Sequence, residues 1–151
     1  HQGLGREVPK VDASRGRRTM VAVGTAIRNG IVTACHDLSD GGLGIALAEM
    51  CFSGSIGARV ALSKVPGSRR FKRDDFLLFS ESNSRFLCEV SARERGKFES
   101  LTAGLRVPCR AIGRTLENPE LLVDGLRGDL VVRLSLSEAE SVWRRALTRR
   151  L

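Results

Sequence analysis

The chain has 151 residues, 42% of them hydrophobic and 28% charged, which suits one globular domain with a buried core and excludes a disordered or collagen-like protein. No apolar run approaches the roughly 20 residues of a membrane-spanning helix, so no membrane association is expected. The net charge of +8 points to an anionic partner, and since the chain has no Tyr and one Trp, it lacks the aromatic side chains that stack on nucleic-acid bases, which favours a phosphorylated small molecule.

The sequence starts without Met or an apolar leader, so residues 1–12 are interpreted as a linker or the cut edge of a longer chain rather than a signal peptide. Residues 13–151 are expected to form the domain, with Asp12 suited to cap its first helix. After Asn29-Gly30, the β-branched run 31–35 predicts a buried strand. Helical spacing predicts one apolar helix face, formed by Met20, Val23, Gly24 and Ile27.

A polar turn is predicted at residues 36–42, between that strand and an apolar segment at 43–52. Because the segment is apolar on nearly every side, we expect a helix that is covered on most faces. Residues 58–62 predict a strand, and residues 63–75 predict a basic loop. The side chains expected to lie buried against a sheet are Leu43, Leu47, Met50 and Phe52.

The second half begins with an apolar stretch, 76–79, a polar break, 80–85, and a strand at 86–90. Ser91 and Glu94 form a capping box that predicts the start of a helix. Further strands are expected near 109–116, 120–124 and 130–134. A second capping box, Ser137 with Glu140, opens a last helix whose apolar side comprises Leu136, Ala139, Val142, Trp143, Ala146 and Leu147.

Helices and strands alternate first and strands cluster later, which predicts the α/β class: a mixed β-sheet with packed helices, forming an α–β sandwich. The cysteines are widely spaced among apolar neighbours, without a C-x-x-C motif or a nearby His pair. This pattern favours reduced core thiols in a cytoplasmic protein over zinc ligands. These residues are Cys35, Cys51, Cys88 and Cys109.

The densest polar cluster lies in the turn between the first strand and the apolar helix, where α/β proteins place ligand loops. Glycine lets the backbone approach a ligand, and the free N–H groups of the next helix favour an anion. Carboxylates at Asp37 and Asp40 suit Mg²⁺ beside a phosphate. A turn in which Asp40 merely caps the helix remains the alternative. The candidate residues are Asp37, Ser39, Asp40, Gly41 and Gly42.

A second polar cluster, within residues 80–85, carries hydroxyls, a carboxylate and a guanidinium suited to a phosphorylated ligand. The alternative is a solvent-exposed turn with Arg85 paired to Glu81. Both clusters end apolar elements, so we expect them on the same edge of the sheet. The candidate residues here are Ser80, Glu81, Ser82 and Arg85.

Two other features carry less chemistry. His36 is the only internal histidine, and no Ser or Cys nucleophile motif accompanies it, so a catalytic triad has no support. The basic loop is interpreted as solvated, with its counter-charges at Asp74 and Asp75. Its five basic residues are Lys64, Arg69, Arg70, Lys72 and Arg73.

The segments 36–43 (His-Asp-Leu-Ser-Asp-Gly-Gly-Leu), 46–50 and 78–87 closely resemble the C-terminal domain of phosphoribosylformylglycinamidine synthase, in the short form that works with separate subunits. The segment 8–12 and the helix around Trp143 fit the same pattern, so the resemblance covers nearly the whole chain. It implies the fold of the aminoimidazole ribonucleotide synthetase C-terminal domain. The activity implied is that of an ATP-dependent ligase of purine biosynthesis.

The resemblance also implies a reaction and partners. ATP and Mg²⁺ activate the amide oxygen of formylglycinamide ribonucleotide, and ammonia from a glutaminase subunit displaces the phosphate. A small accessory subunit and N-terminal domains of the same parent chain complete the enzyme. The family's catalytic residues belong to those N-terminal domains, so none is assigned to this sequence, and the isolated chain is expected to be inactive.

Site residues carry over only in part. In the family's first C-terminal domain, an Asp at the place of Asp37 binds Mg²⁺, and a Glu-Ser pair at the place of Glu81 and Ser82 contacts substrate. This chain looks like the second copy, which faces an auxiliary nucleotide site, so both clusters are interpreted as remnants of a ligand site or as part of that auxiliary site. Two rivals remain: another ATP-using superfamily member, of selenophosphate synthetase or hydrogenase maturation type, and a basic nucleic-acid-binding module.

Overall fold

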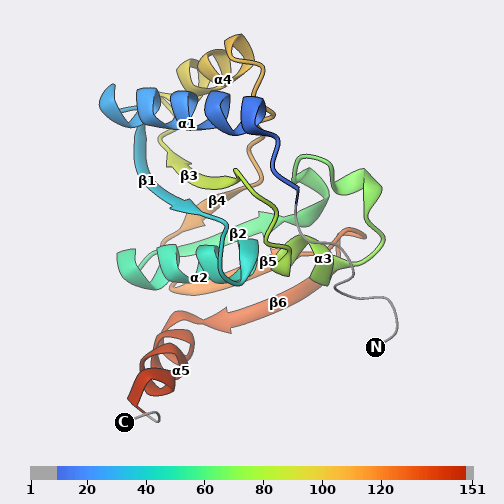
Figure 1. The fold of residues 1–151 in the computed structure, drawn as a ribbon. Helices are drawn as coiled ribbons and strands as arrows, with labels where there is room; N and C mark the ends of the chain where they lie inside the picture. The colour runs from blue at the N-terminus through green and yellow to red at the C-terminus, as the bar shows by residue number, and fades with distance from the viewer. Residues whose placement is uncertain (1–9, 149–151) are drawn as a thin grey trace.

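The computed structural model describes residues 10–148 of the chain (Figure 1). Short 3₁₀ turns, η1 (Leu62–Lys64) and η2 (Ser68–Arg70), follow the second strand. The helices are α1 (Ala13–Arg28), α2 (Gly42–Gly54), α3 (Asp74–Phe79), α4 (Arg95–Gly104) and α5 (Leu136–Thr148). The strands are β1 (Val32–Asp37), β2 (Gly57–Ala61), β3 (Phe86–Val90), β4 (Gly113–Leu116), β5 (Glu120–Asp124) and β6 (Leu130–Ser135).

The strands form two sheets. Strands β1 and β3 pair antiparallel as a two-stranded ribbon, and the second sheet has the order β4-β2-β5-β6. Within it β2 and β5 run parallel while the other pairs are antiparallel, so the sheet is mixed. Helices α1 and α4 lie together beside the ribbon, and α2 lies along the four-stranded sheet (Figure 1). The expected α/β class with helices packed on a mixed sheet is confirmed.

The main core lies between α2 and the four-stranded sheet. Leu43 and Leu47 of α2 are buried together with Val60 of β2 and Val123 of β5. Helix α2 is apolar on most sides because α3 and α5 contact it as well as the sheet. A second cluster, built on Ala26, Ile31 and Val32, joins α1 to the ribbon. Of the four α2 side chains expected to be buried, Met50 and Phe52 are only half-buried.

The strands of the larger sheet alternate between a core face and a charged face. Leu121 and Val123 point into the core, and Glu120 and Asp124, which flank them, carry ion pairs on the other face. There Asp124 binds Arg59, and Glu120 binds Arg133. A sheet with one face packed and the other wet has this alternation.

The apolar face predicted for α1 is confirmed at Val23 but wrong at Met20 and Ile27. Met20 is 62% exposed and Ile27 is 50% exposed, and the helix instead buries small residues against the ribbon and α4. Short side chains allow the closer approach of helix and ribbon that this packing needs. The cap at Asp12 is confirmed, since its carboxylate accepts the Arg15 N–H at 2.9 Å. The buried residues of α1 are Gly16, Thr19, Ala22, Val23 and Ala26.

Three other local predictions need correction. Strand β1 extends through His36 and Asp37, because both pair with β3. The region 63–75 is largely ordered into turns. The capping box at Ser137 does not form. Helix α5 already starts at Leu136, one residue before the expected N-cap, and the Ser137 hydroxyl forms a hydrogen bond of 2.8 Å with that of Ser135. Val142 of the expected apolar side is 63% exposed, and the side chains of Ala146 and Leu147 lie outside the described residues.

The cysteines are all free thiols, as expected, although only Cys51 is buried. Cys35 and Cys88 face each other across the ribbon with their sulfurs 3.6 Å apart. Burial raises the pKa of Cys51 to about 11 and that of Cys88 to about 12, so both stay protonated at neutral pH. Over residues 10–148, no helix has the length and apolar character required to cross a membrane.

Candidate functional site

The two polar clusters lie side by side, as predicted. Strand β1 ends at Asp37, whose register partner is Phe86 at the start of β3, so the turn after β1 and the loop before β3 meet at one end of the ribbon. The Leu38 N–H donates to the Arg85 carbonyl at 3.0 Å, and the Gly41 N–H donates to Glu81 Oε1 at 2.9 Å.

The two glycines are required by the backbone at this junction. Gly41 and Gly42 both have positive φ, +74° and +63°, which side chains other than glycine rarely adopt. A Cβ on Gly42 would lie 2.6 Å from the Ser80 carbonyl oxygen and 2.9 Å from that of Leu78. The start of α2 therefore packs directly on the backbone that carries the second cluster.

The carboxylate of Glu81 takes the position that an anionic ligand was expected to take. It accepts the N–H of Gly41 at the N-cap of α2, where the helix dipole favours negative charge. The alternative in which Asp40 caps the helix is wrong, because the N-cap residue is Gly41 and no side chain caps it. Asp40 lies on the surface instead.

Asp37 presents an ionised, exposed carboxylate at the end of β1. A hydrogen bond from the Ser39 hydroxyl holds the pKa of Asp37 below its usual value. Among residues 10–148, no group of three or more His, Cys, Asp or Glu side chains could hold a metal ion. Since Mg²⁺ is often held by one or two carboxylates together with phosphates and water, Asp37 fits as a single protein ligand to a Mg²⁺ carried by a nucleotide.

Arg85 stabilises the second cluster from within. Its guanidinium donates to the Ser80 carbonyl, to the Ser80 hydroxyl at 3.0 Å and to the Ser82 carbonyl at 3.4 Å. The pairing of Arg85 with Glu81, which belonged to the alternative of a solvent-exposed turn, is wrong, since Glu81 bonds to Gly41. Burial lowers the pKa of Arg85, and these acceptors satisfy the N–H donors of its partly buried guanidinium. The candidate residues that lie exposed at this edge are Asp37, Ser39, Asp40, Glu81 and Ser82.

A contact that sequence reasoning missed joins this edge to the last helix. His36 Nε2 lies 2.9 Å from Glu49 Oε2, and the other oxygen of Glu49 accepts the Trp143 indole N–H at 3.1 Å. The Trp143 ring also packs against Phe52 in a tilted arrangement, with centroids 5.5 Å apart. The signal available in the sequence was Glu49, a lone carboxylate within the apolar helix.

The basic loop is held to the rest of the fold by its acidic neighbours. Arg73 forms an ion pair with Asp75, and its guanidinium lies 4.9 Å from the centre of the Phe76 ring. Asp74 accepts the N–H of Leu126 at 2.7 Å and so ties α3 to the turn after β5. Asp75 therefore acts as a counter-charge to Arg73, whereas Asp74 acts as a structural anchor.

Comparison with known proteins gives a consistent picture. The family described as AIR synthase related protein, C-terminal domain, matches residues 1–124. The phosphoribosylformylglycinamidine synthase subunit PurL of Moorella thermoacetica is 35% identical over 97% of this chain, and the match covers 19% of that relative. PurL of Rhodospirillum rubrum is 38% identical over 87% of the chain and covers 17% of the relative. The chain thus spans about a fifth of the length of these curated relatives.

A solved structure has the same fold. The phosphoribosylformylglycinamidine synthase II of Thermotoga maritima superposes with a TM-score of 0.79 at 23% identity, over 87% of this chain and 22% of that one. At this identity the match shows the fold alone.

Proposed function

This chain belongs to the AIR synthase related C-terminal domain family, and we propose that it is the C-terminal domain of a phosphoribosylformylglycinamidine synthase. The parent enzyme would be a cytoplasmic ligase that converts formylglycinamide ribonucleotide to formylglycinamidine ribonucleotide with ATP and ammonia. Within it, the edge formed by the Asp37–Gly42 turn and the Ser80–Arg85 loop contributes to an auxiliary nucleotide site. The catalytic residues lie outside this chain.

One observation carries this proposal. The two segments that resemble the synthase are held against each other by the bond from Gly41 to Glu81, although forty positions separate them in the chain. At this edge, exposed hydroxyls and carboxylates lie beside the place where the backbone of Gly42 packs closely on that of Ser80. Asp37 would supply one oxygen ligand to Mg²⁺, and the hydroxyls of Ser39 and Ser82 would donate to phosphate oxygens.

The relatives support the ligands and partners of the proposal. Thermotoga maritima PurL has been solved with ATP, with ADP and with FGAR, and also as part of a PurLQS assembly. We therefore extend to the parent of this chain the use of ATP and formylglycinamide ribonucleotide. We also propose association with a glutaminase subunit and a small accessory subunit.

The test uses the product of the complete reading frame in which this chain lies. The nucleotide that the purified protein retains is released and quantified by chromatography, with and without a chelator of Mg²⁺. Asp37→Asn removes the hard anionic ligand while keeping its shape, so retention should fall. Asp129→Asn, in the exposed turn before β6, is the matched control and should retain nucleotide like the wild type. Equal retention by both variants would leave Asp37 as a turn residue only.

A further inference from the structure

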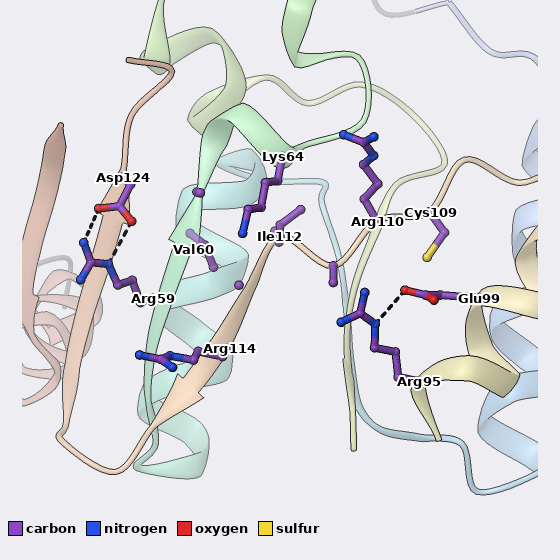
Figure 2. Close-up of a pocket in the computed structure, with 13 residues that line it drawn as sticks. Arg59, Val60, Lys64, Arg95, Glu99, Cys109, Arg110, Ile112, Arg114 and Asp124 are labelled. Atoms are coloured by element: carbon purple, nitrogen blue, oxygen red, sulfur yellow. Dashed lines mark hydrogen bonds and ion pairs between the residues drawn. The ribbon is translucent and has the colours of Figure 1, made fainter. Parts of the chain in front are cut away.

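A large open cleft lies away from the candidate nucleotide site. It has a volume of about 940 Å³ and lies between α4 and the β2–β4 edge of the four-stranded sheet (Figure 2). No residue of the two polar clusters lines it. Its wall carries two acidic side chains, Glu99 and Asp124, and five basic ones, Arg59, Lys64, Arg95, Arg110 and Arg114.

The acidic side chains form ion pairs with only two of the five basic ones, although Asp124 also attracts Lys64 electrostatically. Asp124 accepts two hydrogen bonds of 2.9 Å from Arg59, and Glu99 accepts one of 2.8 Å from Arg95. Lys64, Arg110 and Arg114 make no ion pair with any residue that the structure describes. The cleft thus keeps an excess of positive charge that comes from Lys64, after β2, and from Arg110 and Arg114, in the segment that leads into and includes β4.

Without a bound ligand, Arg114 is repelled by a like charge on the neighbouring strand. Arg59 and Arg114 are direct register partners on the antiparallel strands β2 and β4. Like charges directly opposite each other on one sheet face destabilise the pairing. Asp124 offsets this for Arg59 only, so an anion bound at Arg114 would relieve the remaining repulsion.

The walls of the cleft strengthen its electrostatic field. Val60, Ala111 and Ile112 contribute apolar surface between the charged groups. Figure 2 shows the Lys64 side chain directed toward the space beside Ile112, with Arg114 on the β4 side of the cleft and Arg95 on the α4 side. A concave surface with low-dielectric walls and charges of one sign focuses its potential on a small volume.

We propose that this cleft binds a small molecule carrying two or more phosphate groups, with Lys64, Arg110 and Arg114 as its phosphate contacts. Its volume is that of sites for cofactor-sized ligands. Guanidinium groups bind phosphate through paired N–H donors, and the ammonium of lysine adds a mobile charge. This inference is independent of the synthase activity and of the site at Asp37.

The test measures binding of inorganic tripolyphosphate to the 151-residue chain by calorimetry, at about 150 mM salt to screen loose surface attraction, and without Mg²⁺. Arg114→Ala and Lys64→Ala should each weaken binding about tenfold, as expected for the loss of one charge-assisted contact. Arg127→Ala removes the same charge from an exposed turn outside the cleft and should change affinity less than about twofold. Circular dichroism establishes that each variant is folded.

Two outcomes would overturn the proposal: no binding by the wild type at millimolar tripolyphosphate, or equal weakening by Arg127→Ala and Arg114→Ala. Competition distinguishes the sources of phosphate. A nucleoside triphosphate that displaces tripolyphosphate from the wild type identifies a nucleotide, whereas displacement by inorganic pyrophosphate alone identifies an inorganic ligand. Tighter binding of a single-stranded oligonucleotide, with a steep dependence on salt, would replace the small molecule by a nucleic acid and contradict the proposal.

Discussion

At Gly42, two independent constraints act on one residue. Its backbone is left-handed, and a Cβ there would collide with two carbonyl oxygens of the neighbouring loop. Gly30 has nearly the same φ, +65°, but nothing lies within 4 Å of the place of its Cβ. A comparison of Gly42 with Gly30 therefore distinguishes the cost of backbone strain from the cost of the close approach of two segments.

We expect Gly42→Ala to lower the free energy of unfolding by at least about 2 kcal/mol, because strain and overpacking add. Gly30→Ala should cost only about 1 kcal/mol, from the left-handed backbone alone. Urea denaturation of both variants measures the difference. Equal costs would mean that the loop at Ser80 moves away freely, and that α2 does not depend on it for its position.

The hydrogen bond from Ser39 gives a second prediction for a single residue. Since this bond lowers the pKa of Asp37 in the folded chain, any stability that it contributes is present above the unfolded pKa and is lost as pH falls through the folded one. Ser39→Ala should shift the pKa of Asp37 upward toward its usual value. Carbon-detected NMR of the carboxyl group follows the titration. Ser53→Ala, on α2, is the control and should leave it unchanged.

Among the elements, α2 connects the core to the candidate site. Leu47 is 5% exposed within the main core, whereas Ile45 on the same helix is 41% exposed. Leu47→Ala should cost about 2–5 kcal/mol, from lost burial and the cavity that remains. Ile45→Ala should cost less than about 1 kcal/mol, since little of its surface is buried. Chemical denaturation checks both, and a small cost at Leu47 would make α2 a peripheral helix.

Helix α5 shows how a surface element is held by a few specific contacts. Leu136 is buried at its start, and Trp143 reaches Glu49 and Phe52 on α2. Because Glu49 also contacts His36, the position of α5 is connected to the end of β1, where the candidate nucleotide site lies.

For the whole molecule, the chain alone is expected to lack synthase activity. The family resemblance assigns catalysis to N-terminal domains, and no catalytic residue is assigned here. The purified 151-residue chain should hydrolyse no ATP in the presence of formylglycinamide ribonucleotide and ammonia. Product formation at about 1 s⁻¹ or faster would place the catalytic machinery in this domain. An assay with the complete reading frame is the positive control.

Much of this protein was determined locally and could be predicted from the sequence. The strand at 86–90, the cap at Asp12 and the family resemblance each depend on residues close together in the chain. The adjacency of the two polar clusters was also predicted correctly, because each cluster ends an apolar element. Hydrophobic runs, capping residues and turn glycines each act over a few neighbouring positions, so the sequence alone is enough to recognise them.

Only the tertiary structure decided which side chains meet. Met20 and Ile27 are apolar, yet they lie exposed, and mostly small residues occupy the buried face of α1. Glu81 bonds to α2 rather than to Arg85, and Arg59 meets Arg114 in the basic cleft, through contacts between segments far apart in the chain. Such contacts depend on sheet register and helix packing. The chemistry of a side chain does not by itself specify its partner, because the partner comes near only when the chain folds.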